Sequence, residues 1–118
     1  MMKLLKSFIY AFEGLSYAFR TQRNFRIHCI ALLIVNIVAY FFKISSVEWA
    51  IIWLCIMAVL SLELINTAIE KLCDKVYPEI NPNAKIIKDV AAAAVLIAAL
   101  GSLIIAAFIF TPYFLKTY

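Results

Sequence analysis

The sequence predicts an all-α membrane protein, with an N-terminal amphipathic helix on the membrane surface followed by three transmembrane helices. Of the 118 residues, 66% are hydrophobic and 15% are charged, and the mean hydropathy of +0.97 excludes an ordinary water-soluble domain or a disordered chain. The apolar residues gather in three long runs, and the segment before the first run is amphipathic at the helical period. At this length we expect one domain over residues 1–118.

The first element is an amphipathic helix over residues 3–20. At 100° per residue its large apolar side chains fall in one arc about 100° wide; they are Leu4, Leu5, Phe8, Phe12, Leu15 and Phe19. The opposite arc carries Lys3, Lys6, Tyr10, Glu13, Tyr17 and Arg20. Such a helix lies in the membrane surface. Simple electrostatic anchoring would explain the basic residues, but it does not require Tyr10 and Glu13, which we expect to face a site.

The three apolar runs predict the membrane spans. They are Ile27–Phe42, Val47–Leu62 and Val90–Phe110. The first two hold about 16 residues, or roughly 24 Å of helix, so they need flanking residues to cross roughly 30 Å of hydrocarbon. With those residues we place the spans at about 27–42, 47–69 and 90–112, with a tight turn at Lys43–Ser46 between the first two.

The distribution of Lys and Arg predicts the orientation. Lys43 and Lys116 lie on one side of the spans, and the other nine of the eleven basic residues lie on the opposite side. The positive-inside rule therefore places the N-terminus and the connection between the second and third spans in the cytoplasm, and the C-terminus outside. We expect a multi-pass membrane protein. The net charge of +4 is explained by topology and anionic lipid, so we expect no nucleic acid partner.

An acidic stripe follows the second apolar run, where no Pro or Gly interrupts the expected helix. Glu63, Asn66, Glu70 and Asp74 stand at i, i+3, i+7 and i+11, within about 80° of one another on the helix. An ionised carboxylate at Glu63 is costly at a membrane boundary unless it is paired or bound to a cation, so we expect a function there. Asp74 lies further into solvent and is more simply a structural partner of a lysine. That lysine would be Lys71, Lys75 or Lys88.

Two more polar clusters lie at the same expected depth. Lys88 and Asp89 directly precede the third apolar run, and the stretch from Gln22 to His28 precedes or opens the first. Carboxylates that lie close together suit Mg²⁺ with substrate phosphates, and lysines supply the countercharge. The residues thus indicate magnesium and phosphate chemistry on a substrate that arrives through lipid. His28 by itself is more typical of a structural or interfacial residue than of a catalytic base.

The pattern also resembles a known family. The run Glu63-Leu-Ile-Asn-Thr-Ala-Ile-Glu70 with Asp74, followed by Ala84-Lys-Ile-Ile-Lys-Asp89 and an Ala-rich span, resembles the bacterial integral-membrane diacylglycerol kinase and undecaprenol kinase family. The resemblance covers nearly the whole chain. It implies an ATP- and Mg²⁺-dependent lipid kinase that works as a homotrimer, with active sites shared between neighbouring subunits.

The same resemblance implies roles for individual residues. Glu63 resembles the general base that takes the proton of the lipid hydroxyl, with Asn66 beside it as a positioning group. Glu70 resembles a magnesium ligand at the ATP site. Lys88 and Asp89 resemble nucleotide-binding residues.

The N-terminal part matches the family with one departure. Tyr10 matches a tyrosine of the surface helix at the ATP site, and Lys3 stands where the family often has a basic residue near the lipid. Gln22 occupies the position at which the family usually has a second metal-binding glutamate. Its carbonyl can ligate magnesium at the ATP site but brings no charge, so we predict weaker metal or nucleotide binding, and an inactive family member is an alternative.

The identity of the lipid is a separate prediction. The pattern Arg23-Asn24-x-x-x-His28 resembles the undecaprenol kinase branch, so we predict undecaprenol as the substrate and undecaprenyl phosphate as the product. The alternative is diacylglycerol, which would give phosphatidic acid. A small transporter whose Glu63 binds protons or cations is a further alternative. Depth argues against it, because coupling carboxylates usually lie near mid-membrane and Glu63 lies at one face.

Overall fold

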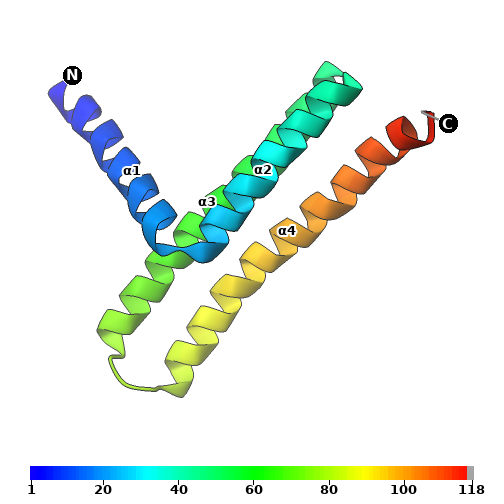
Figure 1. Cartoon of the computed structure of the whole chain (residues 1–118). Helices are drawn as coiled ribbons and strands as arrows, with labels where there is room; N and C mark the ends of the chain where they lie inside the picture. The colour runs from blue at the N-terminus through cyan, green and yellow to red at the C-terminus, as the bar shows by residue number, and fades with distance from the viewer. Residues whose placement is uncertain (117–118) are drawn as a thin grey trace.

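The computed structural model describes residues 1–116, and these fold into four α-helices without a strand (Figure 1). The helices are α1 (Met2–Thr21), α2 (Arg23–Phe42), α3 (Ser46–Val76) and α4 (Pro82–Lys116). Helices α2, α3 and α4 are each long and apolar enough to cross a membrane. The predicted all-α class and the three spans are confirmed, and the protein is a multi-pass membrane protein.

The corner between α1 and α2 forms at Gln22, whose extended backbone (φ −108°, ψ 109°) ends one helix and precedes the next. Arg26 reinforces this corner, since its Nη1 donates to the carbonyl oxygens of Phe19 at 2.9 Å and Arg20 at 3.0 Å. These carbonyls lie in the last turn of α1, where they lack partners within the helix. The corner directs α1 away from the other helices at its N-terminal end (Figure 1).

The predicted tight turn between the first two spans is confirmed. Lys43 adopts the left-handed conformation (φ 52°, ψ 52°), and Ser45 begins α3 with a capping box to Glu48. The hydroxyl of Tyr113 on α4 donates to Oε1 of Glu48 at 2.5 Å. A hydrophobic cluster packs at this end of the molecule; it contains Ala39, Ile44, Ile52, Ile109 and Phe110.

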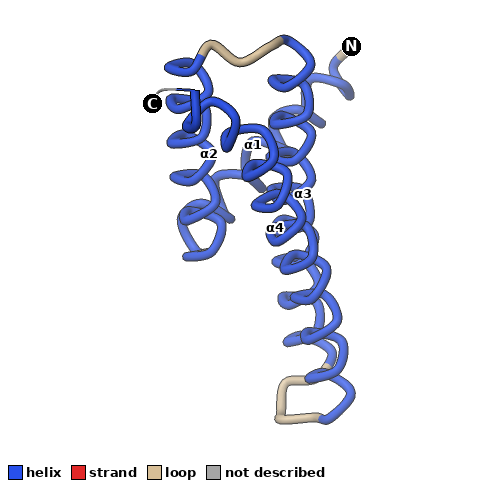
Figure 2. Tube along the Cα trace, turned by 90° about the vertical axis from the view of Figure 1, so that its right-hand side faces the viewer, coloured by secondary structure: helices blue, strands red, loops and turns tan. Residues whose placement is uncertain are grey.

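Helices α3 and α4 are longer than a membrane requires. At 1.5 Å per residue they measure about 46 and 52 Å, against roughly 30 Å of hydrocarbon. They extend past the corner of α1 and α2 to the loop at residues 77–81 (Figures 1 and 2). We call this projection, residues 66–89, the stem. Cys73 and Ala84 are both buried and join its two helices, with Sγ of Cys73 3.6 Å from the carbonyl oxygen of Ala84.

Most apolar residues of the three spans are exposed in the single chain. In a membrane such surfaces are covered by lipid or by other helices. The chain by itself therefore has little core: a buried hydrophobic cluster lies near Lys43, and the most extensive contact between helices is that of α3 with α4.

Candidate active site at the base of the stem

Glu63 lies at the point where α3 passes the start of α2. From Ser46 to Glu63 the helix rises about 26 Å, close to the thickness of the hydrocarbon layer. Glu63 is 4% exposed, and its Oε1 lies 3.3 Å from Nε2 of His28 on α2. A buried carboxylate needs such a polar partner. The sequence pointed to Glu63 because of its position after the apolar run, but it did not connect His28 with Glu63.

Asn66 and Glu70 form the next part of the stripe, one and two turns further along α3. Nδ2 of Asn66 donates to Oε1 of Glu70 at 3.2 Å, which confirms that these residues share a face. Oδ1 of Asn66 is buried and has no hydrogen-bond partner within residues 1–116. Buried polar oxygens are nearly always satisfied, so this atom is a candidate to accept from, or to ligate, a bound group.

Asp74 and Lys88 form an ion pair across the two helices of the stem. This pair brings the expected nucleotide-binding lysine to the acidic stripe, and it agrees with the structural interpretation of Asp74. Asp89 is paired along its own helix, where Oδ2 accepts from Nζ of Lys85 at 2.6 Å. The two predicted clusters on α3 and α4 are therefore brought together by the structure.

Helix α1 meets the site at its C-terminal end only. Nζ of Lys71 on α3 donates to the hydroxyl of Tyr17 at 3.0 Å and lies 4.5 Å from the centre of that ring. The positively charged donor lowers the pKa of Tyr17 below its ordinary value. Tyr10 is 63% exposed and Lys3 is also exposed, and both belong to the part of α1 that points away from the stem (Figure 1).

Part of the acidic stripe could hold Mg²⁺. Within the described residues no three His, Cys, Asp or Glu side chains gather around one point. The half-buried Glu70 and the unsatisfied Oδ1 of Asn66 are nevertheless hard oxygen donors of the kind that Mg²⁺ prefers together with phosphate oxygens. Gln22, half-buried at the α1–α2 corner, donates from Nε2 to Oγ1 of Thr21 at 3.3 Å.

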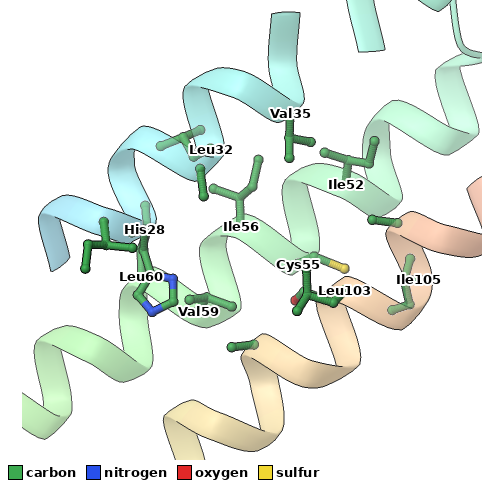
Figure 3. Close-up of a pocket in the computed structure, with 15 residues that line it drawn as sticks. His28, Leu32, Val35, Ile52, Cys55, Ile56, Val59, Leu60, Leu103 and Ile105 are labelled. Carbon is green, nitrogen blue, oxygen red and sulfur yellow. The ribbon is translucent and has the colours of Figure 1, made fainter. Parts of the chain in front are cut away.

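An apolar groove of about 290 Å³ runs along α2, α3 and α4 on the membrane side of Glu63 (Figure 3). His28 lies among its lining residues. The others are almost all apolar and include Leu32, Val35, Ile56, Val59 and Leu103. The geometry thus links a polar site to an apolar groove through His28, which lines the groove and contacts Glu63.

Comparison with known proteins decides the family. Residues 9–110 match the family described as prokaryotic diacylglycerol kinase. The chain belongs to this family. It is 43% identical over 110 residues to the undecaprenol kinase of Bacillus subtilis, with 93% of this chain and 89% of that protein covered.

Other relatives are named diacylglycerol kinases. The chain is 43% identical over 110 residues to a diacylglycerol kinase of Synechocystis, covering 92% of this chain and 63% of that longer protein. It is 36% identical over 117 residues to a diacylglycerol kinase of Helicobacter pylori, covering 98% and 88%. The resemblance inferred from the sequence is confirmed: this family member is a lipid kinase, a phosphotransferase, which decides against a small transporter.

Proposed function

We propose that this lipid kinase transfers the γ-phosphate of ATP to the hydroxyl of undecaprenol. The observation that carries the proposal is the buried Glu63, whose partner His28 lines the apolar groove, at the start of the polar stem. A lipid alcohol keeps its chain in hydrocarbon and its hydroxyl at the boundary. Glu63 therefore lies at the depth of the acceptor, and the stem lies on the side from which ATP would approach.

The choice between the two lipids rests on the sequence pattern of α2. Overall identity is 43% to an undecaprenol kinase and also 43% to a diacylglycerol kinase, so it favours neither. The pattern Arg23-Asn24-x-x-x-His28 supports undecaprenol because it resembles that branch. Diacylglycerol is the second candidate, supported by the names of two of the relatives.

Phosphoryl transfer depends mainly on alignment and on neutralising charge. In the proposed reaction Glu63 takes the proton as the O–H bond of the lipid breaks. The lipid oxygen forms its bond to the γ-phosphorus, and the bond to the bridging oxygen breaks, so ADP leaves with that electron pair. Asn66 positions the stripe by its hydrogen bond to Glu70.

The remaining residues bind the co-substrates in this proposal. Glu70 and Gln22 would hold Mg²⁺, which neutralises phosphate charge when it is bound. Lys88 and Asp89 bind the nucleotide. Tyr10 of α1 completes the ATP site and Lys3 lies near the lipid. Asp74 supports Lys88 through their ion pair.

We also propose a homotrimer in the bacterial inner membrane, with the N-terminus inside and the C-terminus outside. The nine basic residues on the stem side support this orientation. The exposed apolar faces of α2–α4 and the distance of Tyr10 and Lys3 from the stem support sites that are completed by a neighbouring subunit. Residues 1–118 would act as one lipid-kinase domain with α1 on the membrane surface.

The proposal is tested with the purified protein in lipid nanodiscs. Transfer of labelled γ-phosphate from ATP is measured to undecaprenol and, in parallel, to diacylglycerol, with and without Mg²⁺. We expect Mg²⁺-dependent transfer with a higher kcat/KM for undecaprenol. A preference for diacylglycerol would assign the chain to the second candidate, and absence of transfer to both would indicate an inactive family member.

A further inference from the structure

The structure assigns a role to His28 that neither the sequence pattern nor the comparisons provide. We propose that His28 is a positioning residue for Glu63: its imidazole holds Oε1 of the carboxylate, so that Oε2 faces the lipid hydroxyl at the end of the apolar groove. This inference rests on the proposed role of Glu63 as the general base. It adds His28 as the residue that orients the carboxylate of Glu63.

The first argument is geometric. His28 and Glu63 come from different helices, and Nε2 of His28 lies 3.3 Å from Oε1 of Glu63. Within residues 1–116 no other side chain forms a hydrogen bond or an ion pair with this carboxylate. Thr67, which lies one turn further along α3, donates to the backbone carbonyl of Glu63 at 2.9 Å and does not engage its carboxylate. The orientation of the base therefore depends on His28.

The second argument concerns the chemical type of the partner. A buried carboxylate needs a polar neighbour, but a permanent positive charge at this distance would stabilise the ionised form and weaken the base. A histidine is a milder partner than Lys or Arg, because its imidazole carries a full charge only when it is protonated. The lysines of the site are placed elsewhere, since Lys71 contacts Tyr17 and Lys88 contacts Asp74.

The third argument is the position of the ring. His28 lines the apolar groove (Figure 3), and its Nε2 also contacts Glu63, so the ring links the groove to the base. Its side chain is 24% exposed, against 5% for Glu63. A lipid alcohol that lies in the groove would reach the carboxylate beside this ring. The contact of His28 with Glu63, the buried carboxylate of the described residues, indicates more than a packing role for this histidine.

The decisive comparison uses two amides of different length. The side-chain nitrogen of Gln can take the place of Nε2 of histidine, whereas that of Asn falls short of it and lies closer to the position of Nδ1. We expect His28→Gln to retain most of kcat, and His28→Asn to lower kcat about 10- to 100-fold, as expected when a catalytic group is misplaced by about 1 Å. KM for ATP should stay unchanged in both, because the residues proposed to bind ATP and Mg²⁺ lie on the stem, at Tyr10 and at Gln22, and none of them lines the groove.

Asn36→Leu is the matched control, because it also removes a polar group from α2. Nδ2 of Asn36 donates only to the carbonyl oxygen of Leu32, at 2.7 Å, so kcat should remain that of the wild type. The second measurement repeats His28→Asn in a Glu63→Asp background, in which the shortened carboxylate has already withdrawn from the ring. In that background His28→Asn should lower kcat little further, because the two residues act as a unit.

The outcomes separate this inference from the proposed function. Equal kcat values for the Gln and Asn variants would overturn the role of His28 alone. So would a loss of kcat from His28→Asn that is as large in the Glu63→Asp background as in the wild type, or a rise in KM for ATP at constant kcat. Absence of transfer by the wild type to either lipid would overturn the proposed function and this inference together.

Discussion

Glu63→Gln is the substitution that separates chemistry from folding in this protein. Gln has nearly the same shape as Glu but cannot accept the proton of the lipid hydroxyl. Removal of a general base typically lowers a rate by about 10²- to 10⁴-fold, which corresponds to about 3 to 5 kcal/mol of transition-state stabilisation. We expect a fall in kcat in this range, with little change in KM for ATP.

The same substitution should not destabilise the fold. The carboxylate is 4% exposed and has His28 as its polar partner at 3.3 Å. Burying an ionised carboxylate costs several kcal/mol, which one polar neighbour offsets only in part. A neutral amide removes that cost, so we expect the free energy of unfolding to be unchanged or to rise by about 1 kcal/mol, as at other sites where function requires a buried charge.

The assay measures both quantities on one preparation. Labelled phosphate transfer to undecaprenol gives kcat, and thermal unfolding in the same nanodiscs gives the stability. Glu48→Gln is the matched control on the same helix, because Gln also completes a capping box with Ser45 and can accept from Tyr113. A kcat within about threefold of the wild type for Glu63→Gln, or a similar loss in both variants, would refute the reasoning.

Three further predictions concern the nucleotide and metal side of the site. Gln22→Glu should lower the Mg²⁺ concentration for half-maximal activity by about tenfold, since a carboxylate adds a charged ligand, and an unchanged Mg²⁺ titration would contradict the role of Gln22. Asp74→Asn should raise KM for ATP by at most about fivefold, because it releases Lys88 from an exposed ion pair. A loss of kcat as large as that of a removed base would instead place Asp74 in the chemistry. Lys71→Met should raise the pKa of Tyr17 toward its ordinary value, because the charged donor that lowers this pKa is lost. Alkaline absorbance titration against a Tyr17→Phe reference measures the pKa of Tyr17. The same pKa with and without Lys71 would show that Lys71 does not lower it.

The fold class was predictable because membrane spans are encoded locally. A continuous apolar run of sufficient length leaves the backbone little choice but to satisfy its hydrogen bonds within a helix. The three spans, the turn at Lys43 and the continuation of α3 through Glu63 were all expected from the sequence and are present. The ends of the helices were less predictable, since α2 begins at Arg23 and α4 at Pro82, where polar residues continue a helix beyond the hydrocarbon.

The acidic stripe was likewise determined by the sequence alone. Its members lie on a single helix, so their spacing fixes their common face whatever surrounds them, and the hydrogen bond between Asn66 and Glu70 follows from that spacing. The sequence also predicted that α4 meets this stripe, because only a short connection joins the two long helices. The ion pair of Asp74 and Lys88 confirms that contact.

Only the tertiary structure decided how the base is held. His28 and Glu63 are 35 positions apart on separate helices, and no local periodicity relates their side chains. Their meeting depends on the angle at which α2 crosses α3, which is set by the corner at Gln22, the turn at Lys43 and side-chain packing along both helices. Sequence spacing therefore determined which residues face the cytoplasmic boundary together. Interhelical packing decided which of them touch, because contacts between helices depend on geometry that no single helix contains.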